Sequence, residues 1–234
     1  MGGRQLRILS GGAAQGLVRA LTPQFKARNG CEIEATFGAV GAMRDKLLAG
    51  TPADMLILTS ALIVELARAG HVIAGSAADI GTVPTAVAVR SGDPVPSIGD
   101  VAALRKALRA ADGVYFPDPK LATAGIHFAK VIEALGLGEE LKNHLRTFPN
   151  GATAMRELAA VKGGRPIGCT QVTEILAMPG VTLVGSLPKG FELATVYTIG
   201  ICAKAQEPEL ARQFAALMTD TDARELRERL GFSR

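Results

Sequence analysis

Aromatic side chains are scarce in this sequence: they make up 4% of the 234 residues, and there is no Trp. The core must therefore be built from Ala, Val, Leu and Ile, a composition that suits parallel strands covered by Ala-rich helices. Hydrophobic residues make up 48% of the chain and charged residues 21%, which excludes a disordered or fibrous protein. A chain of this length forms one large domain or two small ones.

Long apolar runs are also missing. None approaches the ~20 residues of a transmembrane helix, so we expect no insertion into a membrane. The first residues lead directly into the apolar run 6–9, with no signal peptide before it. We therefore expect either a cytoplasmic chain or a periplasmic one whose leader has been removed.

The cysteines give no disulfide framework. Cys31, Cys169 and Cys202 are an odd number of widely spaced thiols, typical of small buried residues and weakly favouring a reducing compartment. The sequence also lacks a P-loop, a nucleophile elbow and a cluster of metal ligands. Gly11-Gly12 lacks the third glycine of a dinucleotide fingerprint. We expect neither a metal nor another cofactor.

The net charge is +4 and the pI is about 9.1, which favours an anionic partner. The basic residues are dispersed, however, and the cluster Arg105, Lys106 and Arg109 has no aromatic residues between its members for base stacking. The cluster is typical of a solvated helix face. We expect a small anionic ligand and no nucleic acid.

Short apolar runs alternate with helical patterns, which predicts an α/β fold with mostly parallel sheets flanked by helices. Three strand–helix units come first, and the pattern changes after Gly81. A strand at 85–90 then begins a second series, and a long strand at 194–203 precedes two closing helices. The second series contains predicted helices at 101–110, 124–135, 139–145 and 152–161 and strands at 113–116, 166–170 and 181–184.

The second series repeats the architecture of the first, which predicts two lobes. We assign residues 1–83 to the N-terminal part of lobe 1 and residues 84–193 to lobe 2. Residues 194–234 form the return crossover and the C-terminal part of lobe 1. Ligands of open α/β sheets bind beyond the carboxyl ends of the strands, where helix N-termini converge. We therefore expect a ligand-binding cleft between the lobes.

Three segments resemble a known family. The segment 50–56 (GTPADML) is similar to the G-x-P-A-D segment that introduces the third strand of type II anion-binding proteins. The segment 117–126, with Asp118 and Gly125, resembles that family's turn into a long lobe-2 helix, and 223–232 resembles its closing helix. Because the matches occur in order, the chain resembles the molybdate-binding branch of the type II periplasmic binding proteins. The resemblance implies a two-lobed fold with a discontinuous first lobe, and it makes Asp54 a structural residue.

Four predicted helix starts can direct backbone N–H groups and the positive end of the helix dipole at an anion. They lie at 12–13, 40–41, 124–125 and 152–153, where small residues let the backbone approach a ligand closely. The predicted ligand-binding residues are Ser10, Gly11, Gly12, Ala13, Ala39, Val40, Gly41, Thr123, Ala124, Gly125, Ala152, Thr153 and Gln171.

The chain departs from the family where molybdate binders carry oxygen atoms. The serines that the resemblance implies at the first two helix starts are replaced by Ala13 and by Ala39 or Val40, and the implied tyrosine falls near Gln171. Each missing hydrogen bond would cost a desolvated oxyanion roughly 1–3 kcal/mol. We therefore expect an organic carboxylate, with an apolar body against Ala39 and Val40, rather than molybdate.

Several polar side chains have both a binding and a structural interpretation. Ser10 could contact the ligand or bond to its own loop. Thr123 and Thr153 could contact the ligand or cap helices, and capping is favoured for Thr123. Arg44 could bind a carboxylate ligand, but a pair with a surface carboxylate is favoured. His127, in the first turn of the lobe-2 helix, could be a general acid or base, although a packed or surface histidine is more common there.

The function indicated by these patterns is that of a solute-binding protein that delivers a small anion to the permease of an ABC transporter. The alternative is an enzyme on the same fold. Aconitate isomerase resembles the molybdate binders and moves a proton on a tricarboxylate, and in that case His127 is the candidate catalytic residue. A third interpretation is a cytoplasmic ligand sensor.

Overall fold

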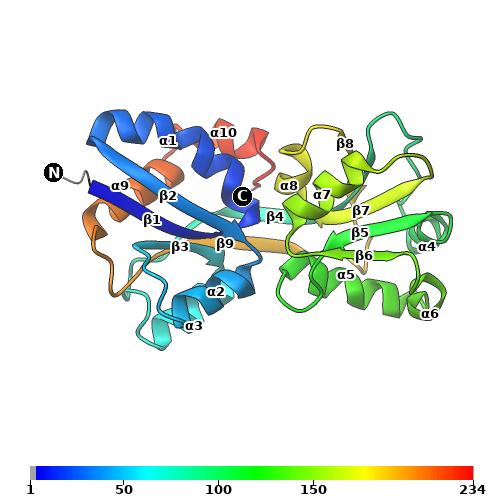
Figure 1. Ribbon diagram of the computed structural model, residues 1–234, viewed down its shortest axis with the longest axis horizontal. Coiled ribbons are helices and arrows are strands. Elements are labelled where there is room, and N and C mark those ends of the chain that lie inside the picture. The colour runs from blue at the N-terminus through cyan, green and yellow to red at the C-terminus, as the bar shows by residue number, and fades with distance from the viewer. Residues whose placement is uncertain (1–3, 234) are drawn as a thin grey trace. The chain divides into compact units, whose positions relative to one another are not determined.

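The computed structural model describes residues 4–233, and the chain divides into two compact units (Figure 1). Unit 1 combines the chain up to Val83 with the chain from Val196 onward, and unit 2 is Pro84–Thr195. Two strands, β4 (Ala78–Arg90) and β9 (Ala194–Ile201), carry the chain from one unit to the other. Unit 1 is therefore discontinuous in sequence.

The sheet of unit 1 has the strand order β2-β1-β3-β9. Strands β1 (Arg4–Gly11), β2 (Cys31–Gly38) and β3 (Met55–Thr59) are parallel, and β9 is antiparallel to β3. The first four residues of β3 are all buried, as expected for a central strand covered by helices on both faces.

Helices cover both faces of this sheet, with α1 and α9 on one side and α2 and α3 on the other (Figure 1). An edge-to-face contact between Phe25 of α1 and Phe214 of α9, with ring centroids 4.8 Å apart, joins the first pair. The helices of unit 1 are η1 (Gly12–Ala14), α1 (Gln15–Asn29), α2 (Val40–Leu48), α3 (Ser60–Arg68), α9 (Pro208–Thr219) and α10 (Arg224–Arg229).

The sheet of unit 2 is mixed. Strand β7 (Pro166–Gln171) is parallel to β5 (Gly113–Pro117), which is parallel to β6 (Leu145–Phe148). Strand β4 is antiparallel both to β7 and to β8 (Val181–Ser186). Residue 145 lies in β6 and not in a helix, so the helix predicted at 139–145 is too long: α6 ends at Leu141.

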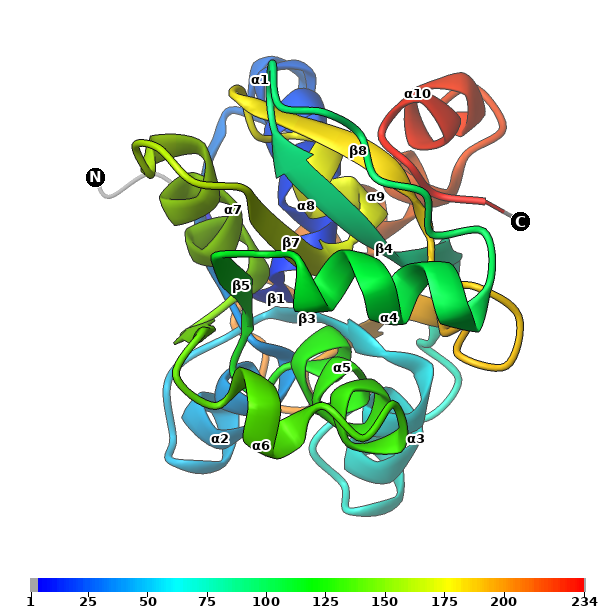
Figure 2. The ribbon, with the colours of Figure 1, turned by 90° about the vertical axis from the view of Figure 1, so that its right-hand side faces the viewer.

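Unit 2 has one hydrophobic core on each face of its sheet (Figure 2). Helices α4, α5 and α6 cover the core that contains Phe116 and Phe128, while α7 and α8 cover the core that contains Met155 and Ile175. These helices are α4 (Val101–Arg109), α5 (Thr123–Ala134), α6 (Gly138–Leu141), α7 (Gly151–Ala160) and α8 (Val172–Leu176).

The three cysteines are buried and free: Cys31 and Cys202 lie in unit 1, and Cys169 lies in unit 2. Burial raises the pKa of all three thiols, that of Cys202 to about 12. Within residues 4–233, no helix is long and apolar enough to span a membrane.

Candidate functional site

The first group of candidate donors lies where β1 and β2 end and their following helices begin. The two strands are parallel with Gly11 opposite Gly38, so η1 and α2 begin at the same edge of the sheet. The start of α2 is buried, and no side chain of residues 4–233 caps it. The first N–H groups of a helix have no acceptor within the helix. The backbone at Ala39, Val40 and Gly41 can therefore donate hydrogen bonds to an anion.

Apolar atoms surround these donors. Ala13 of η1 and Val40 of α2 are both buried. A Cβ added to Gly11 would lie 2.8 Å from Cγ1 of Val40 and 3.1 Å from Cε1 of Tyr197, so the bare backbone of Gly11 packs directly against both side chains. Gly12, the first residue of η1, is partly exposed. Aliphatic side chains and the edge of an aromatic ring therefore lie beside the backbone donors. Such surroundings suit a ligand with an apolar part.

For Ser10, the structure shows the bond to its own loop that was one of its two interpretations. Its side chain is fully buried, and its hydroxyl donates a 2.9 Å hydrogen bond to the carbonyl oxygen of Gly11. The bond stabilises the turn from β1 into η1. The hydroxyl can donate a hydrogen bond to a ligand only if it gives up this bond.

The second group of candidate donors lies at the start of α5 in unit 2. The Asp118 carboxylate accepts from the backbone N–H groups of Lys120 and Leu121 at 2.7 and 2.9 Å, which shapes the turn after β5. A Cβ on Gly125 would lie 2.3 Å from the carbonyl oxygens of both Pro117 and Asp118, so only glycine fits there. The sequence pattern of an Asp-Pro turn followed by glycine thus has a direct steric cause.

The start of α5 has no side-chain cap within the described part of the chain. Its N-cap residue is Ala122, and Thr123 is already the first helical residue, so the capping role predicted for Thr123 is wrong. Ala124 and Gly125 are buried in the first turn. Their position next to an uncapped helix end keeps them candidates for contact with an anion.

The start of α7 differs, because its donors are already bonded within the chain. Asn150 is the N-cap, and its side chain accepts from the backbone N–H of Thr153 at 2.8 Å. The N–H groups of Gly151 and Ala152 bond to the carboxyl group of Glu174. This helix start, predicted as a ligand site around Ala152 and Thr153, therefore holds a carboxyl group of the protein itself.

Glu174 is a buried acid on α8 with a perturbed pKa. Desolvation raises its pKa above the ordinary value, and hydrogen bonds from the Thr170 hydroxyl and from the backbone N–H groups of Gln171, Ala152 and Gly151 offset part of this shift. The Thr170 hydroxyl lies 2.5 Å from Oε2 of Glu174. A buried carboxyl with a raised pKa is suited to carry a proton.

Three other side chains have structural partners. Nε2 of His127 lies 2.8 Å from the carbonyl oxygen of Phe191, and since a carbonyl only accepts, Nε2 carries the proton. Arg44 pairs with Asp45 at 2.8 Å, as the sequence favoured. Asp54 accepts backbone N–H groups and is buried, which agrees with its structural interpretation.

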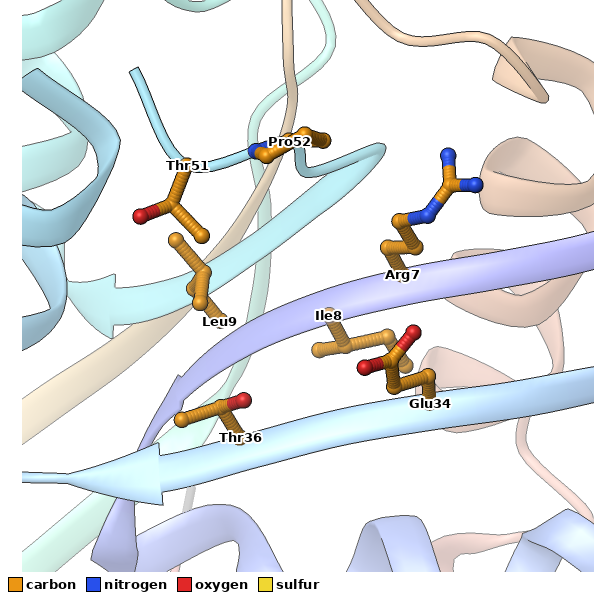
Figure 3. Close-up of a pocket in the computed structure, with 7 residues that line it drawn as sticks. All are labelled: Arg7, Ile8, Leu9, Glu34, Thr36, Thr51 and Pro52. Carbon is orange, nitrogen blue, oxygen red and sulfur yellow. The ribbon is translucent and has the colours of Figure 1, made fainter. Parts of the chain in front are cut away.

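Unit 1 also contains a hollow of about 230 Å³ on the outer part of its sheet (Figure 3). Arg7 and Leu9 of β1 line it together with Glu34 and Thr36 of β2 and with the loop that holds Thr51. The Arg7 guanidinium donates to the side chain of Gln206 at 2.7 Å. The carboxylate of Glu34 lines this hollow and would repel an anion, and none of the predicted site residues lines it. The hollow is therefore a poor candidate for the anion site.

Sequence reasoning missed two residues of these candidate sites, Glu174 and Tyr197. Glu174 is the one acidic residue in the 31-residue stretch from 158 to 188, which is the signal that could have identified it. Tyr197 is one of two tyrosines in the chain and the one aromatic residue of β9. Each signal points to a site residue only once its contact is known, which is Gly151 for Glu174 and Gly11 for Tyr197.

The two α/β units and their uncapped helix starts define the class of two-lobed α/β binding proteins. The comparison with protein families agrees: residues 6–233 match the family of bacterial extracellular solute-binding proteins, and the chain belongs to that family. The predicted resemblance to its molybdate-binding branch is confirmed.

Relatives with different ligands share this fold. The chain is 27% identical to an aconitate isomerase of Pseudomonas sp., covering 93% of this chain and 83% of that protein. It is 23% identical to the molybdate-binding protein ModA of Mycobacterium tuberculosis, covering 100% and 86%. Its structure is similar to the periplasmic molybdate-binding protein of Azotobacter vinelandii, with a TM-score of 0.80, 18% identity and coverage of 98% and 99%.

A second solved structure, PEB3 with bound L-phospholactate, has a TM-score of 0.70 with 14% identity and covers 98% of this chain and 99% of that one. Inorganic and organic anions thus both occur among proteins of this fold. The fold alone does not determine the ligand of this chain.

Proposed function

We propose that this protein is a periplasmic solute-binding protein for a small organic anion and delivers it to the permease of an ABC transporter. Membership of the extracellular solute-binding family supports the binding role. The observation that carries the ligand class is the buried, uncapped start of α2, whose backbone donors stand beside Val40 instead of a hydroxyl group. Backbone donors favour an anion, and the apolar neighbours favour one with a hydrocarbon part.

The number of side-chain donors argues against a tetrahedral metal oxyanion. Ala13 and Val40 present only carbon atoms, and the hydroxyl of Ser10 already bonds to Gly11. Each absent hydrogen bond weakens the binding of a desolvated anion by roughly 1–3 kcal/mol. Two absent bonds would weaken molybdate binding by a factor of about 30 or more, since 1.4 kcal/mol corresponds to tenfold in affinity.

Calorimetric titration with molybdate, sulfate, phosphate, succinate, citrate and aconitate tests the proposal. We expect an organic carboxylate to bind more tightly than molybdate and sulfate. We also expect one ligand per chain. Tight binding of molybdate alone would show that backbone donors suffice and would contradict the proposed ligand class.

A second candidate function is the isomerisation of a small organic acid. Two observations favour it: the 27% identity to an aconitate isomerase and the buried Glu174, whose raised pKa suits proton transfer. In such a reaction, a base takes a proton from a carbon next to a carboxylate and the C–H electron pair moves into an enolate. The base then returns the proton to a different carbon. His127 remains the other candidate base, through its Nδ1 atom.

Incubation with aconitate in D₂O, followed by NMR, separates the two functions. An enzyme incorporates deuterium into the ligand or converts it, and a pure binding protein does neither. If Glu174 is the base, Glu174→Gln should slow exchange by roughly 10²–10⁴-fold while His127→Ala leaves most of it. The reverse result would assign the proton transfer to His127.

A further inference from the structure

Unit 2 contains a small hollow of about 170 Å³ that none of the predicted ligand-binding residues lines. Three segments form its walls. The loop after β4 contributes Val95 and Pro96, the C-terminal end of α4 contributes Ala107 and Ala110, and the start of β7 contributes Ile167. The hollow therefore lies within one unit and is built from side chains of the loop, the helix and the sheet.

This hollow and the candidate anion donors of unit 2 lie at opposite ends of the same sheet. Strand β7 runs from Pro166, which lines the hollow, to Gln171, which is one of the predicted ligand-binding residues. The ends of a strand of this length are roughly 16 Å apart. Strand β5 is parallel to β7, so α5, which follows β5, begins at the Gln171 end. The hollow is therefore a separate site.

The walls of the hollow are mainly apolar for reasons that the sequence explains. Pro94 and Pro96 have no backbone N–H, so the loop cannot continue the pairing of β4. Val95 stands between them and is 59% exposed. Ala107 and Ala110 have short side chains, which leaves space beside α4. Walls of this kind favour a ligand with a hydrocarbon part.

Asp93 supplies a negative group with an unused acceptor. Its Oδ1 accepts a hydrogen bond of 2.8 Å from Nη2 of Arg90, whereas its Oδ2 is buried and has no hydrogen-bond partner within residues 4–233. Buried polar atoms are stabilised by a partner, and a charged donor gives the stronger bond. The C-terminal end of α4 adds the negative end of a helix dipole. This side of the hollow favours an ammonium group.

Arg165 supplies a positive group at the same hollow. Its backbone N–H donates to Asp112 at 2.7 Å, while its side chain is exposed and forms no ion pair within residues 4–233. Arg90 holds the two charged residues near each other, because its Nη2 donates both to Asp93 and, at 3.2 Å, to the carbonyl oxygen of Gly164. A carboxylate and a guanidinium group thus line one small apolar hollow.

We propose that this hollow binds an apolar α-amino acid in its zwitterionic form. The ammonium group of the ligand bonds to Asp93, its carboxylate pairs with Arg165, and its hydrocarbon side chain packs against Val95 and Ile167. A ligand that carries only negative charge would be repelled by Asp93, and one that carries only positive charge would be repelled by Arg165. This binding activity does not depend on the anion site at the other end of the sheet.

The test uses L-leucine and three probes that each lack one of its groups. Isoamylamine lacks the carboxylate, isocaproate lacks the ammonium group, and glycine lacks the hydrocarbon side chain. Each probe is titrated into the full chain, and the chemical shifts of its backbone amides give both the affinity and the location of binding. We expect leucine to bind most tightly and to shift the signals of Val95, Ala107 and Ile167.

Two variants assign the charged groups. Asp93→Asn keeps an oxygen that can accept from Arg90 but removes the charge, so it should weaken leucine and isoamylamine by about tenfold or more and should not weaken isocaproate. Arg165→Gln, at an exposed side chain, should weaken leucine and isocaproate by about 2–5-fold and leave isoamylamine unchanged. Arg105→Gln, at an exposed arginine of α4 that does not line the hollow, is the control and should bind leucine like the wild type.

The outcomes decide the proposal in one direction or the other. Leucine binding at the hollow, weakened in the stated pattern by both variants, supports it. Absence of shift changes with leucine at millimolar concentration overturns it, and so do shift changes confined to the starts of α2 and α5. Equal affinity for leucine in the wild type and in Arg165→Gln removes the role of Arg165 and with it the zwitterion. If Asp93→Asn distorts the hollow and weakens every probe, the Arg165→Gln titrations alone decide.

Discussion

Val40 puts an apolar side chain at the uncapped start of α2, where the resemblance to molybdate binders implies a serine at position 39 or 40. It begins α2, is 7% exposed and packs against the backbone of Gly11. Val40→Ser adds a hydroxyl donor next to uncapped N–H groups. We expect it to strengthen molybdate binding by roughly 5–100-fold, which corresponds to one hydrogen bond to a charged group. Val40→Ala, which removes carbon without adding a donor, is the control in the same titration.

Asp54 shows how one buried carboxylate stabilises unit 1. Its Oδ2 accepts from the N–H of Arg7 in β1 at 2.8 Å, and its Oδ1 accepts from the N–H groups of Gln206 and Glu207 before α9 at 2.7 and 3.0 Å. Asp54→Ala leaves these donors without their acceptor, and we expect a loss of roughly 2–4 kcal/mol in the free energy of unfolding. Asp45→Ala, at a half-exposed side chain that pairs with its neighbour Arg44, should change it by less than about 0.5 kcal/mol in the same urea titration.

Glu174 makes stability depend on pH in the direction opposite to an acid in an ion pair. Its folded-state pKa is raised, so between the unfolded and the folded pKa the native protein binds more protons than the unfolded chain. Stability should therefore fall as the pH rises through this window. In urea titrations without ligand, the free energy of unfolding of Glu174→Gln minus that of the wild type should increase as the pH rises. A constant difference would contradict the raised pKa.

The sequence predicted residues whose roles follow from local chemistry. The structural interpretation of Asp54 and the Arg44 pair agree with the structure. Glu174 was not predicted, because its role depends on a glycine 23 positions earlier in the chain and on a turn that brings the two together. The close contact between the two residues is set by packing between elements that are distant in the sequence. Composition and periodicity carry no information about such packing.

At the scale of elements, the contact between β5 and α5 provides a sharp test. A Cβ at position 125 would lie 2.3 Å from two carbonyl oxygens, so Gly125→Ala must shift the start of α5 away from β5. We expect it to lower the free energy of unfolding by roughly 1–3 kcal/mol and to weaken ligand binding. Gly99→Ala is the control, since a Cβ there meets no atom within 4 Å. Equal effects of the two variants, measured by thermal unfolding and calorimetry, would contradict the steric role.

Elements with a strong hydrophobic period were predicted well, and short exposed ones were not. The long helices α1 and α5 and the buried strands β3 and β7 fall where the alternation of apolar residues places them. Strand β6 was missed because its four residues are exposed or half-buried at the edge of the sheet and carry no pattern.

At the scale of the whole molecule, the cysteines report the unfolding of each unit. All three thiols are buried, and burial raises their pKa values, so the reactive thiolate is rare in the folded protein. We expect Cys31 and Cys202 to react with iodoacetamide only when unit 1 opens, and Cys169 only when unit 2 opens. Pulsed labelling along a urea gradient, read by mass spectrometry, shows whether the two transitions coincide. Rapid labelling of any thiol in native buffer would contradict the burial.

The discontinuity of unit 1 has a consequence for the protein while it is being made. A ribosome releases the chain from its N-terminus, so β1, β2 and β3 emerge long before β9, their last partner in the sheet. Until residue 201 has left the exit tunnel, one edge of the strongly apolar β3 has no strand beside it. Unit 2 is continuous and can fold during this interval. Nascent chains that stall between the two crossover strands should therefore be the ones that chaperones bind and that aggregate.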